Sequence, residues 1–258
     1  MIDTHSHLLP GLDDGSPDLG TSLKMAAEAV AFGTTIVVCT PHLRELDLSF
    51  VGRAQEEILS LRTALTGAGI ELDLVLGFEV GLDVVATLGR KELEPLVIEG
   101  SGGALLIEIP HWGWPVYALE TVFRLRTEGL LPVLAHPERN DRIQRAPDLL
   151  TKCLDAGAVA QGTAASLNGD FGRASKQAFY RHLSRGDMSL IASDAHSHRR
   201  SSWTLAPAVA TLRGMVSAEE ADMLVRVNPG MVLTGGRPAA VMPSQRRPSW
   251  RMRTRRGW

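Results

Sequence analysis

The stretch that decides the fold lies between residues 104 and 136. The segment Ala104–Glu108 reads ALLIE and the segment Leu131–His136 reads LPVLAH, and each is a short, mostly apolar run that ends in a polar residue. Between them, Leu119, Val122 and Phe123 recur at the spacing of one helix face. Apolar strands that alternate with amphipathic helices are typical of a parallel sheet covered by helices.

Runs of the same kind extend over most of the chain. Ser16-Pro17 is typical of a helix start. Ser217–Glu220 has the capping-box pattern, for a helix that we expect to end before Asn228-Pro229. Seven strand–helix units favour a closed α/β barrel over residues 1–236. The predicted strands are Met1–His5, Thr34–Thr40, Leu72–Glu79, Ala104–Glu108, Leu131–His136, Val159–Gly162 and Ser189–Asp194.

The composition excludes several classes of protein. Of the 258 residues, 44% are apolar and 22% are charged, so the chain can bury a sizeable core and is not globally disordered. The longest uncharged run, residues 29–43, is too short and too polar for a membrane span. Two cysteines, Cys39 and Cys153, are too few for a disulfide framework, and the first residues lack the pattern of a secretory signal. We therefore expect a cytoplasmic protein.

Charge is distributed unevenly along the chain. The formal net charge is −2, yet residues 237–258 contain seven arginines and no acidic residue. The remaining acidic body is not typical of a nucleic-acid binder, but it is compatible with carboxylates gathered around cations. We expect residues 237–258 to be a flexible Arg-rich tail. A contact with nucleic acid, an anionic membrane or an acidic partner is the alternative for this tail.

Histidines and acidic residues fall at the predicted strand ends. In a βα barrel, functional residues lie at the C-terminal ends of the strands. Six of the seven predicted strands carry His, Asp or Glu there, whereas the sixth ends in Gln161-Gly-Thr163. We therefore expect these side chains to converge at the barrel mouth. The candidate metal ligands are His5, His7, Asp14, His42, Glu79, Glu108, His136, Asp194 and His196.

The residue types at these positions indicate a metal centre. In an extended chain, His5 and His7 point to the same side. Imidazole together with carboxylate suits zinc, manganese or iron, and nine ligands suffice for two or three divalent ions. Clustered divalent ions are typical of phosphoester hydrolysis. The sequence therefore predicts a metal-dependent hydrolase.

Some histidines and acidic residues have a structural alternative. Asp13-Asp14-Gly15 is either a ligand-bearing loop or a turn before a helix capped by Ser16. We expect His111, His182 and His198 to be ordinary loop or structural histidines, because they lie outside the strand-end pattern.

Arginines and aromatic residues also lie near the predicted mouth. Arg139 follows the fifth strand end, and Arg199 and Arg200 follow the last one. A guanidinium can hold two phosphate oxygens at once, so these arginines are candidate phosphate ligands, with exposed surface arginines as the alternative. The segment Trp112–Tyr117 either forms a wall that receives an aromatic substrate or packs beneath its own loop.

The absence of several catalytic motifs limits which group can be the nucleophile. A cysteine phosphatase needs an arginine six positions after its thiolate, but Glu45 stands there for Cys39 and Val159 for Cys153. The chain has no Asp-x-Asp pair and no Gly-Lys-Ser/Thr phosphate loop. Metal-activated water is the remaining nucleophile.

Seven short motifs, taken in order, resemble a known family. They are MIDTHSH (residues 1–7), DDG (13–15), TPH (40–42), GFE (77–79), EIP (108–110), AHPER (135–139) and SDAH (193–196). The set resembles the polymerase and histidinol phosphatase (PHP) superfamily, and within it the bacterial metal-dependent protein-tyrosine phosphatases of capsule and exopolysaccharide loci. This resemblance implies a distorted (β/α)7 TIM-like barrel (the PHP fold) with a manganese-type centre of three ions. It also implies hydrolysis of phosphotyrosine, typically on the tail of a bacterial tyrosine kinase that controls polysaccharide export.

The resemblance further implies roles for individual residues. Arg139 resembles the phosphate-holding arginine of the family, and Arg200 resembles the second one, with Arg199 as its competitor. The basic segment after Arg237 has no expected counterpart. The ligands of one ion are implied to be His5, His7, Glu108 and Asp194, with Asp14, His42, Glu79, His136 and His196 serving the others.

Two other functions remain open on the sequence. One is a phosphatase for a small phosphomonoester such as histidinol phosphate. The other is a metal-binding regulatory subunit without catalytic activity, which the full set of strand-end ligands disfavours. Neither a nucleic-acid partner nor a membrane span is expected.

Overall fold

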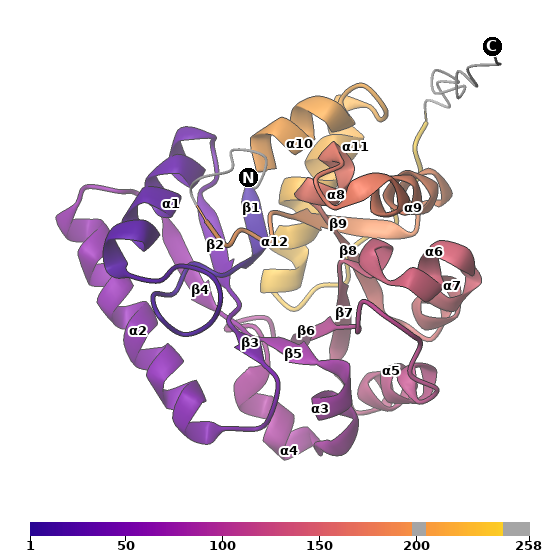
Figure 1. The fold of residues 1–258 in the computed structure, drawn as a ribbon, viewed down its shortest axis with the longest axis horizontal. Helices are drawn as coiled ribbons and strands as arrows, with labels where there is room; N and C mark the ends of the chain where they lie inside the picture. Colours follow the sequence, from indigo (N-terminus) through magenta and orange to yellow (C-terminus); the bar gives the residue numbers. More distant parts are fainter. Residues whose placement is uncertain (198–204, 245–258) are drawn as a thin grey trace, which may run out of the picture.

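A ring of parallel strands surrounded by helices forms the body of the protein (Figure 1). The computed structural model describes residues 1–197 and 205–244. His198, Arg199, Arg200 and the end of the Arg-rich segment therefore lie outside the described residues. In the described part of the chain, no helix has the length and apolar character needed to cross a membrane.

All seven predicted strand segments contain a strand, and two of these strands continue after a short interruption. β2 lies within Thr34–Thr40 and β3 just after it, whereas β4 and only the first residue of β5 lie within Leu72–Glu79. The register of pairing does not change across these interruptions. Ile36 pairs with Asp73 and His42 pairs with Glu79, and the two pairs have the same separation in residue number. The strands are β1 (Ile2–Ser6), β2 (Ile36–Cys39), β3 (His42–Leu43), β4 (Asp73–Leu76), β5 (Glu79–Gly81), β6 (Ala104–Glu108), β7 (Leu131–Ala135), β8 (Val159–Thr163) and β9 (Met188–Ala192).

The first and last strands of the ring, β1 and β9, contact each other at their carboxyl ends. They form one sheet of order β1-β2-β4 and a second of order β3-β5-β6-β7-β8-β9. β1 meets β9 at its carboxyl end, where the backbone N–H of Asp194 donates to the carbonyl of His5 at 2.9 Å. The N–H of His7 donates to the carbonyl of Ala195, also at 2.9 Å. The predicted distorted (β/α)7 TIM-like barrel is confirmed, and the distortion lies in this one-sided contact.

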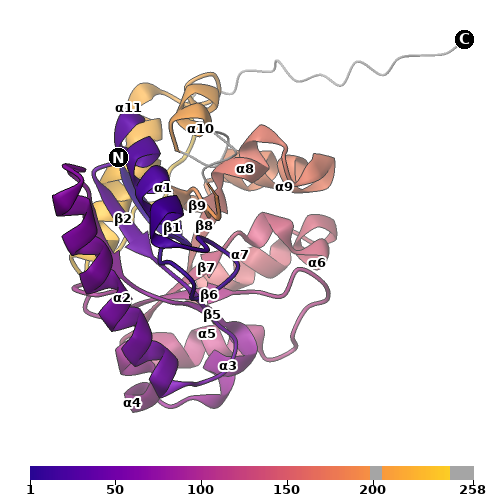
Figure 2. The ribbon, with the colours of Figure 1, turned by 60° about the vertical axis from the view of Figure 1, so that its left-hand side comes forward.

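The helices cover the outside of the ring, with α1 and α2 on one side and α6 to α9 on the other (Figure 2). They are α1 (Leu19–Ala31), α2 (Leu48–Gly67), α3 (Leu82–Thr87), α4 (Arg90–Leu93), η1 (Glu94–Leu96), α5 (Ala118–Thr127), η2 (Pro137–Arg139), α6 (Asp141–Arg145), α7 (Asp148–Asp155), α8 (Ala164–Asn168), α9 (Gly172–Arg185), α10 (Leu205–Leu212), α11 (Ala218–Asp222), η4 (Met223–Val227) and α12 (Asn228–Leu233).

The first helix begins later than the sequence predicts. Asp18 caps α1 by accepting a hydrogen bond from the N–H of Thr21 at 2.7 Å, while the hydroxyl of Ser16 donates to the carbonyl of Asp18. The prediction that Ser16 caps this helix is therefore wrong. Residues 13–15 are not the turn that enters the helix, and this leaves them free to lie over the barrel mouth.

The core consists of two separate apolar layers. Inside the ring, Val38, Leu106, Val133 and Leu190 come from four strands and pack with Val232 of α12. α12 lies against the first residues of β1, so it closes the end of the barrel opposite to the strand ends that carry the candidate ligands. The second layer lies between the strands and the surrounding helices. Each buried side chain of this size contributes about 1.5–3 kcal/mol to folding.

The last helix also continues farther than predicted. The capping box of Ser217 and Glu220 is confirmed, but α11 passes through the π-helical turn η4 into α12 without ending before Asn228. Pro229 has no N–H to donate, and the wider π turn before it accommodates the lost hydrogen bond.

Asn228 connects this helix to two other segments. Its Nδ2 donates to the carbonyls of Ser189 and Ala239, each at 2.8 Å, and its Oδ1 accepts from the N–H of Ala239 at 3.0 Å. Val241 is buried as well, so the first residues of the Arg-rich segment pack against the body. The domain boundary at residue 236 and a flexible tail beyond it stay predictions.

Replacing Asn228 with alanine removes these three hydrogen bonds from a fully buried position. We expect the free energy of unfolding to fall by about 2–4 kcal/mol, because a buried polar group left without a partner costs about 1–3 kcal/mol. Denaturant titration measures the change. The control is Glu56→Ala on the exposed face of α2, which we expect to stay within about 0.5 kcal/mol of the parent. An unchanged midpoint for N228A would contradict this structural role.

Candidate metal centre

A β-bulge in β1 directs its side chains into the barrel mouth. Between Asp3 and Ser6, β1 advances three residues while β2 advances two. Such a bulge changes the face to which the following side chains point. Thr4 Oγ1 and His5 Nδ1 therefore both reach the side chain of Gln161 on β8, at 2.8 and 3.0 Å. From the bulge onward, the histidine pair of β1 faces the interior of the mouth.

The carboxylate of Glu79 lies at the centre of the site. It is fully buried, and its Oε2 lies 3.1 Å from His5 Nε2, 3.4 Å from His7 Nε2 and 3.0 Å from His42 Nδ1. Its Oε1 lies 2.8 Å from His136 Nε2. Four imidazoles, delivered by three different strand ends, thus meet one carboxylate.

Asp194 supplies a second carboxylate to the same cluster. Its Oδ1 lies 3.3 Å from His5 Nε2 and 3.4 Å from His7 Nε2. Asp194 and His136 have φ values of 55° and 33°, and among the described residues they are the two non-glycine residues with positive φ. Backbone conformations of this kind cost about 1–3 kcal/mol each and are concentrated at functional sites.

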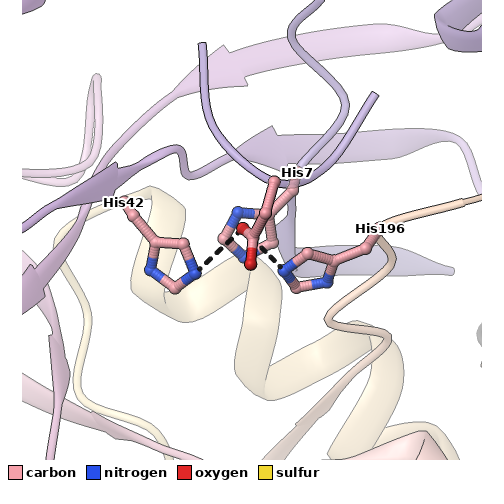
Figure 3. A group of neighbouring side chains, drawn as sticks. His7, His42 and His196 are labelled. Atoms are coloured by element: carbon pink, nitrogen blue, oxygen red, sulfur yellow. Dashed lines mark ion pairs between the residues drawn. The ribbon is translucent and has the colours of Figure 1, made fainter. Parts of the chain in front are cut away.

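The outer part of the mouth contains Asp14, His42 and His196. Asp14 Oδ1 lies 3.4 Å from His42 Nε2 and 3.5 Å from His196 Nε2 (Figure 3). The ring of His196 stacks on that of His7 with centroids 3.9 Å apart. Asp14 therefore lies among imidazoles, as the ligand-bearing alternative for the loop at residues 13–15 predicts.

Glu108 lies at the opposite edge of the cluster. Its Oε2 is 3.8 Å from His42 Nδ1, and its Oε1 is 3.9 Å from His111 Nε2. The ring of His111 also lies 5.5 Å from that of His136. His111 is thus not the ordinary loop or structural histidine that we expect from the sequence, where its position three residues after a strand-end carboxylate is the available signal.

Two side chains orient the imidazoles of β1. Asp13 Oδ2 lies 2.6 Å from His7 Nδ1 and also accepts the backbone N–H of His42, while Gln161 binds His5 Nδ1. Burial disfavours the charge of Asp13, but the hydrogen bond from His7 prevails and lowers the pKa of Asp13 to about 2. With both Nδ1 atoms engaged, both Nε2 atoms face the interior. Neither Asp13 nor Gln161 was predicted as part of the site.

The charges of the cluster favour a bound cation. Burial disfavours ionised Glu79, yet the charge of His5 and the hydrogen bond of His136 hold the pKa of Glu79 well below its usual value. Burial likewise opposes a charge on His5 and His7, but the facing carboxylates raise the pKa of both imidazoles. Divalent cations that replace these protons would satisfy the same carboxylates.

The chemistry of the donor atoms fits divalent ions. Among the described residues, Glu79 Oε2, His42 Nδ1 and His111 Nε2 are buried without a hydrogen-bond partner. The Nε2 atoms of His5 and His7 face each other at 3.1 Å, where one proton at most can lie between them. Buried polar atoms without partners are costly, and coordination of a shared ion removes that cost.

The donor atoms form four overlapping groups. Within each group, all donor atoms lie within 4.8 Å of one another. All nine predicted ligands belong to at least one group. In the group of His5 and His7 the second carboxylate beside Asp194 is Glu79, whereas the resemblance implied Glu108. The groups are His5, His7, Glu79 and Asp194; His7, Asp14, His42 and His196; His42, Glu79 and Glu108; and Glu108, His111 and His136.

Arg139 borders the cluster. Its Nη1 donates to Asp194 Oδ2 at 3.0 Å, and its guanidinium lies 4.0 Å above the ring of Phe171. The turn that carries it is held by the buried carboxylate of Glu138, which accepts the N–H of Thr163 at 3.0 Å. The second predicted arginine, Arg200, lies outside the described residues, so its role stays a prediction.

An aromatic loop follows Glu108. Trp112 is 80% exposed, so it does not pack beneath the loop, whereas Trp114 packs against the core. Asn140 holds the loop by donating to the carbonyls of Pro110 at 2.6 Å and Gly113 at 2.8 Å. Because Asn140 directly follows Arg139, the aromatic loop and the arginine are fixed to each other.

Neither cysteine belongs to the site. Cys39 and Cys153 are both buried. Burial raises the pKa of both thiols, that of Cys153 to about 11. Thiolate attack is therefore disfavoured, in agreement with the missing cysteine-phosphatase motif.

A parallel barrel with this histidine and carboxylate cluster on its carboxyl rim defines the class as a metal-binding barrel of the PHP type. Residues 1–234 match the family described as capsular polysaccharide synthesis, CpsB/CapC, and the chain belongs to that family. The resemblance noted in the sequence is thereby confirmed.

Individual relatives agree with this assignment. The tyrosine-protein phosphatase YwqE of Bacillus subtilis is 34% identical over 200 residues, which cover 76% of this chain and 78% of YwqE. The tyrosine-protein phosphatase CpsB of Streptococcus pneumoniae is 26% identical over 207 residues, covering 76% of this chain and 83% of CpsB.

Solved structures support the fold. A crystal structure from work on YwqE and CpsB, described as unique metal-dependent tyrosine phosphatases, has a TM-score of 0.80 at 28% identity and covers 95% of this chain and all of that one. The histidinol phosphate phosphatase of Lactococcus lactis has a TM-score of 0.54 at 12% identity, covering 86% of this chain and 95% of that one. The second likeness shows the fold alone.

Replacing Gly15 with alanine tests whether the loop at residues 13–15 belongs to the metal centre. A Cβ at this position would collide with the carbonyl oxygen and Cβ of His7. The loop must then move, and Asp13 and Asp14 move with it. We expect Gly15→Ala to weaken divalent-metal binding at least about 10-fold, as for other changes beside metal ligands.

Isothermal titration with manganese measures this effect. The matched control is Gly52→Ala on α2, where a Cβ meets no atom within 4 Å. Wild-type metal affinity in G15A would show that the loop does not support the metal centre.

Proposed function

We propose that this chain is a metal-dependent phosphatase that removes phosphate from phosphotyrosine in proteins. The observation that carries the proposal is the Glu79 cluster, in which four imidazoles meet one buried carboxylate beside the Arg139 guanidinium. Such a site binds clustered divalent ions and a phosphate group at the same rim. Membership of the CpsB/CapC family and the names of its relatives support the same activity.

The side chains of this chain bind and orient the substrate. Phe171 and Asp194 fix the guanidinium of Arg139, whose remaining N–H groups would hold two phosphate oxygens. Asp13 and Gln161 hold the imidazoles of β1 in one tautomer and one orientation. Divalent cations held by the four ligand groups would supply Lewis acidity and would lower the pKa of water, the expected nucleophile. No phosphorylated enzyme residue is required.

The aromatic loop favours an aromatic phosphoester. Trp112 and Tyr117 remain accessible on the loop that Asn140 ties to the Arg139 turn. An exposed aromatic ring on the loop that follows Glu108 can contact the ring of a phosphotyrosine.

The finer parts of the proposal concern the ions, the partner and the compartment. We expect two or three ions, with manganese as the physiological metal and iron or zinc as substitutes, because the ligands combine imidazole and carboxylate. The expected substrate is the tail of a bacterial tyrosine kinase that controls capsule or exopolysaccharide synthesis, in keeping with the family description. A cytoplasmic location follows from such a partner and from two buried, unpaired cysteines.

Removing two ligands tests the activity. We expect His5→Ala combined with His7→Ala to lower kcat/KM for p-nitrophenyl phosphate by about 1,000-fold or more, because both Nε2 atoms face the centre of the cluster. Prolonged treatment with a chelator should inactivate the wild-type protein, and manganese should restore it.

The same assay distinguishes the alternatives. Circular dichroism of the double variant shows whether the fold is retained. Wild-type rates in that variant would rule out the metal assignment. Faster hydrolysis of histidinol phosphate than of a phosphotyrosine peptide would favour the small-molecule alternative, and no hydrolysis of either by metal-loaded protein would favour a non-catalytic subunit.

Arg139 is tested by two substitutions. We expect Arg139→Ala to lower kcat/KM for a phosphotyrosine peptide by about 100- to 1,000-fold, the range typical of a lost donor to developing charge. Arg139→Lys should recover only part of this loss, since an ammonium cannot hold two oxygens at once. Metal content is measured in parallel because Arg139 also contacts Asp194. Full activity of R139A at normal metal content would refute the role.

A further inference from the structure

An open groove leads away from the metal centre toward the start of α2. It has a volume of about 390 Å³ and begins at Asp14 and His42, which belong to the metal centre. Beyond them it is lined by Arg44 and Glu45, which follow β3, and by Arg53 in the first turns of α2. A chain whose phosphorylated side chain enters the centre can therefore lie along this groove.

The two arginines of the groove are available for binding. Arg44 and Arg53 are exposed, and among the described residues neither forms a salt bridge with a carboxylate. Arg53 is nevertheless held in place, because its guanidinium lies 5.5 Å from the centre of the Phe50 ring.

The nearby acidic groups are mostly engaged elsewhere. Asp47 caps α2 by accepting hydrogen bonds from the backbone N–H groups of Ser49 at 2.8 Å and Phe50 at 3.2 Å. Asp13 binds His7 and the backbone of His42. Glu45 and Asp47 together balance the charge of Arg44 and Arg53, but within the described residues neither carboxylate forms a salt bridge with them, so both guanidiniums keep N–H donors for a ligand.

We propose that this groove is a peptide-binding subsite in which Arg44 and Arg53 select an acidic side chain close to the phosphotyrosine in the substrate sequence. The inference rests on the proposed function and adds a sequence preference to it. Guanidiniums at a groove wall bind carboxylates by charge-assisted hydrogen bonds, and such pairs steer and orient a peptide. The selected group is the carboxylate of Asp or Glu.

A peptide series tests the preference directly. The series contains one phosphotyrosine in an alanine-rich background, with a single glutamate or lysine placed at each of the three positions before and after it. For the wild type we expect glutamate in one or two positions to raise kcat/KM about 5- to 10-fold over lysine, which corresponds to two partly exposed charge pairs. Arg44→Ala combined with Arg53→Ala should bring this ratio close to one.

Two further variants make the test specific. Arg53→Glu should invert the ratio in favour of lysine, and Glu45→Ala should increase the preference for glutamate because it removes a like charge. Lys91→Ala, an exposed cation on α4 outside the groove, is the matched control and should leave the ratio unchanged. The ratio compares two peptides on the same enzyme, so partial misfolding of a variant does not mimic the result.

The outcomes separate this inference from the proposed function. Hydrolysis of all phosphotyrosine peptides with equal kcat/KM would overturn the groove while the phosphatase activity stands. A preference for glutamate that persists in the double arginine variant would also overturn it. If neither the peptides nor p-nitrophenyl phosphate were hydrolysed by metal-loaded protein, the proposed function itself would fail.

Discussion

Glu79 is a carboxylate that is 1% exposed, and the architecture of the site follows from how its charge is compensated. An isolated buried carboxylate costs several kcal/mol, so it requires partners with favourable geometry. Here the partners are imidazoles that arrive from β1, from β3 and from the residue after β7. The same convergence leaves donor atoms facing one another, and divalent cations relieve that arrangement. The buried charge of Glu79 thus requires the same imidazole partners that make the barrel mouth suitable for divalent cations.

The contact that closes the ring involves the same residues as the metal centre. The backbone of His5 on β1, and of His7 directly after it, binds the backbone of Asp194 and Ala195 after β9, while the side chains of His5, His7 and Asp194 meet inside the mouth. Strain at Asp194 and His136 is confined to this rim. The cooperative hydrogen bonding of the barrel can hold such conformations, which would not persist in an isolated loop. The same residues therefore close the ring of strands and provide metal ligands.

Around this centre, the loops provide contacts of different chemistry. The turn after β7 presents a guanidinium, the loop after β6 presents exposed aromatic rings, and the segment from β3 to α2 presents two further guanidiniums. Each of these segments is held by side-chain hydrogen bonds, such as those of Asn140 in the aromatic loop or of Asp47 at the start of α2. A barrel rim can combine phosphate, ring and peptide contacts in this way because each loop varies independently of the strands.

The sequence by itself determined where the strands lie and which polar residues end them, because apolar runs and their polar ends are local properties of the chain. It also placed nine side chains at one rim, since all parallel strands of a barrel end on the same side. The tertiary structure alone decided the partners: Glu79 beside His5, Asp13 beside the backbone of His42, and Gln161 behind His5. Those pairings depend on the bulge in β1, on strand register and on the path of each loop. None of these leaves a periodic trace in the sequence, because they are set by contacts between segments far apart along the chain.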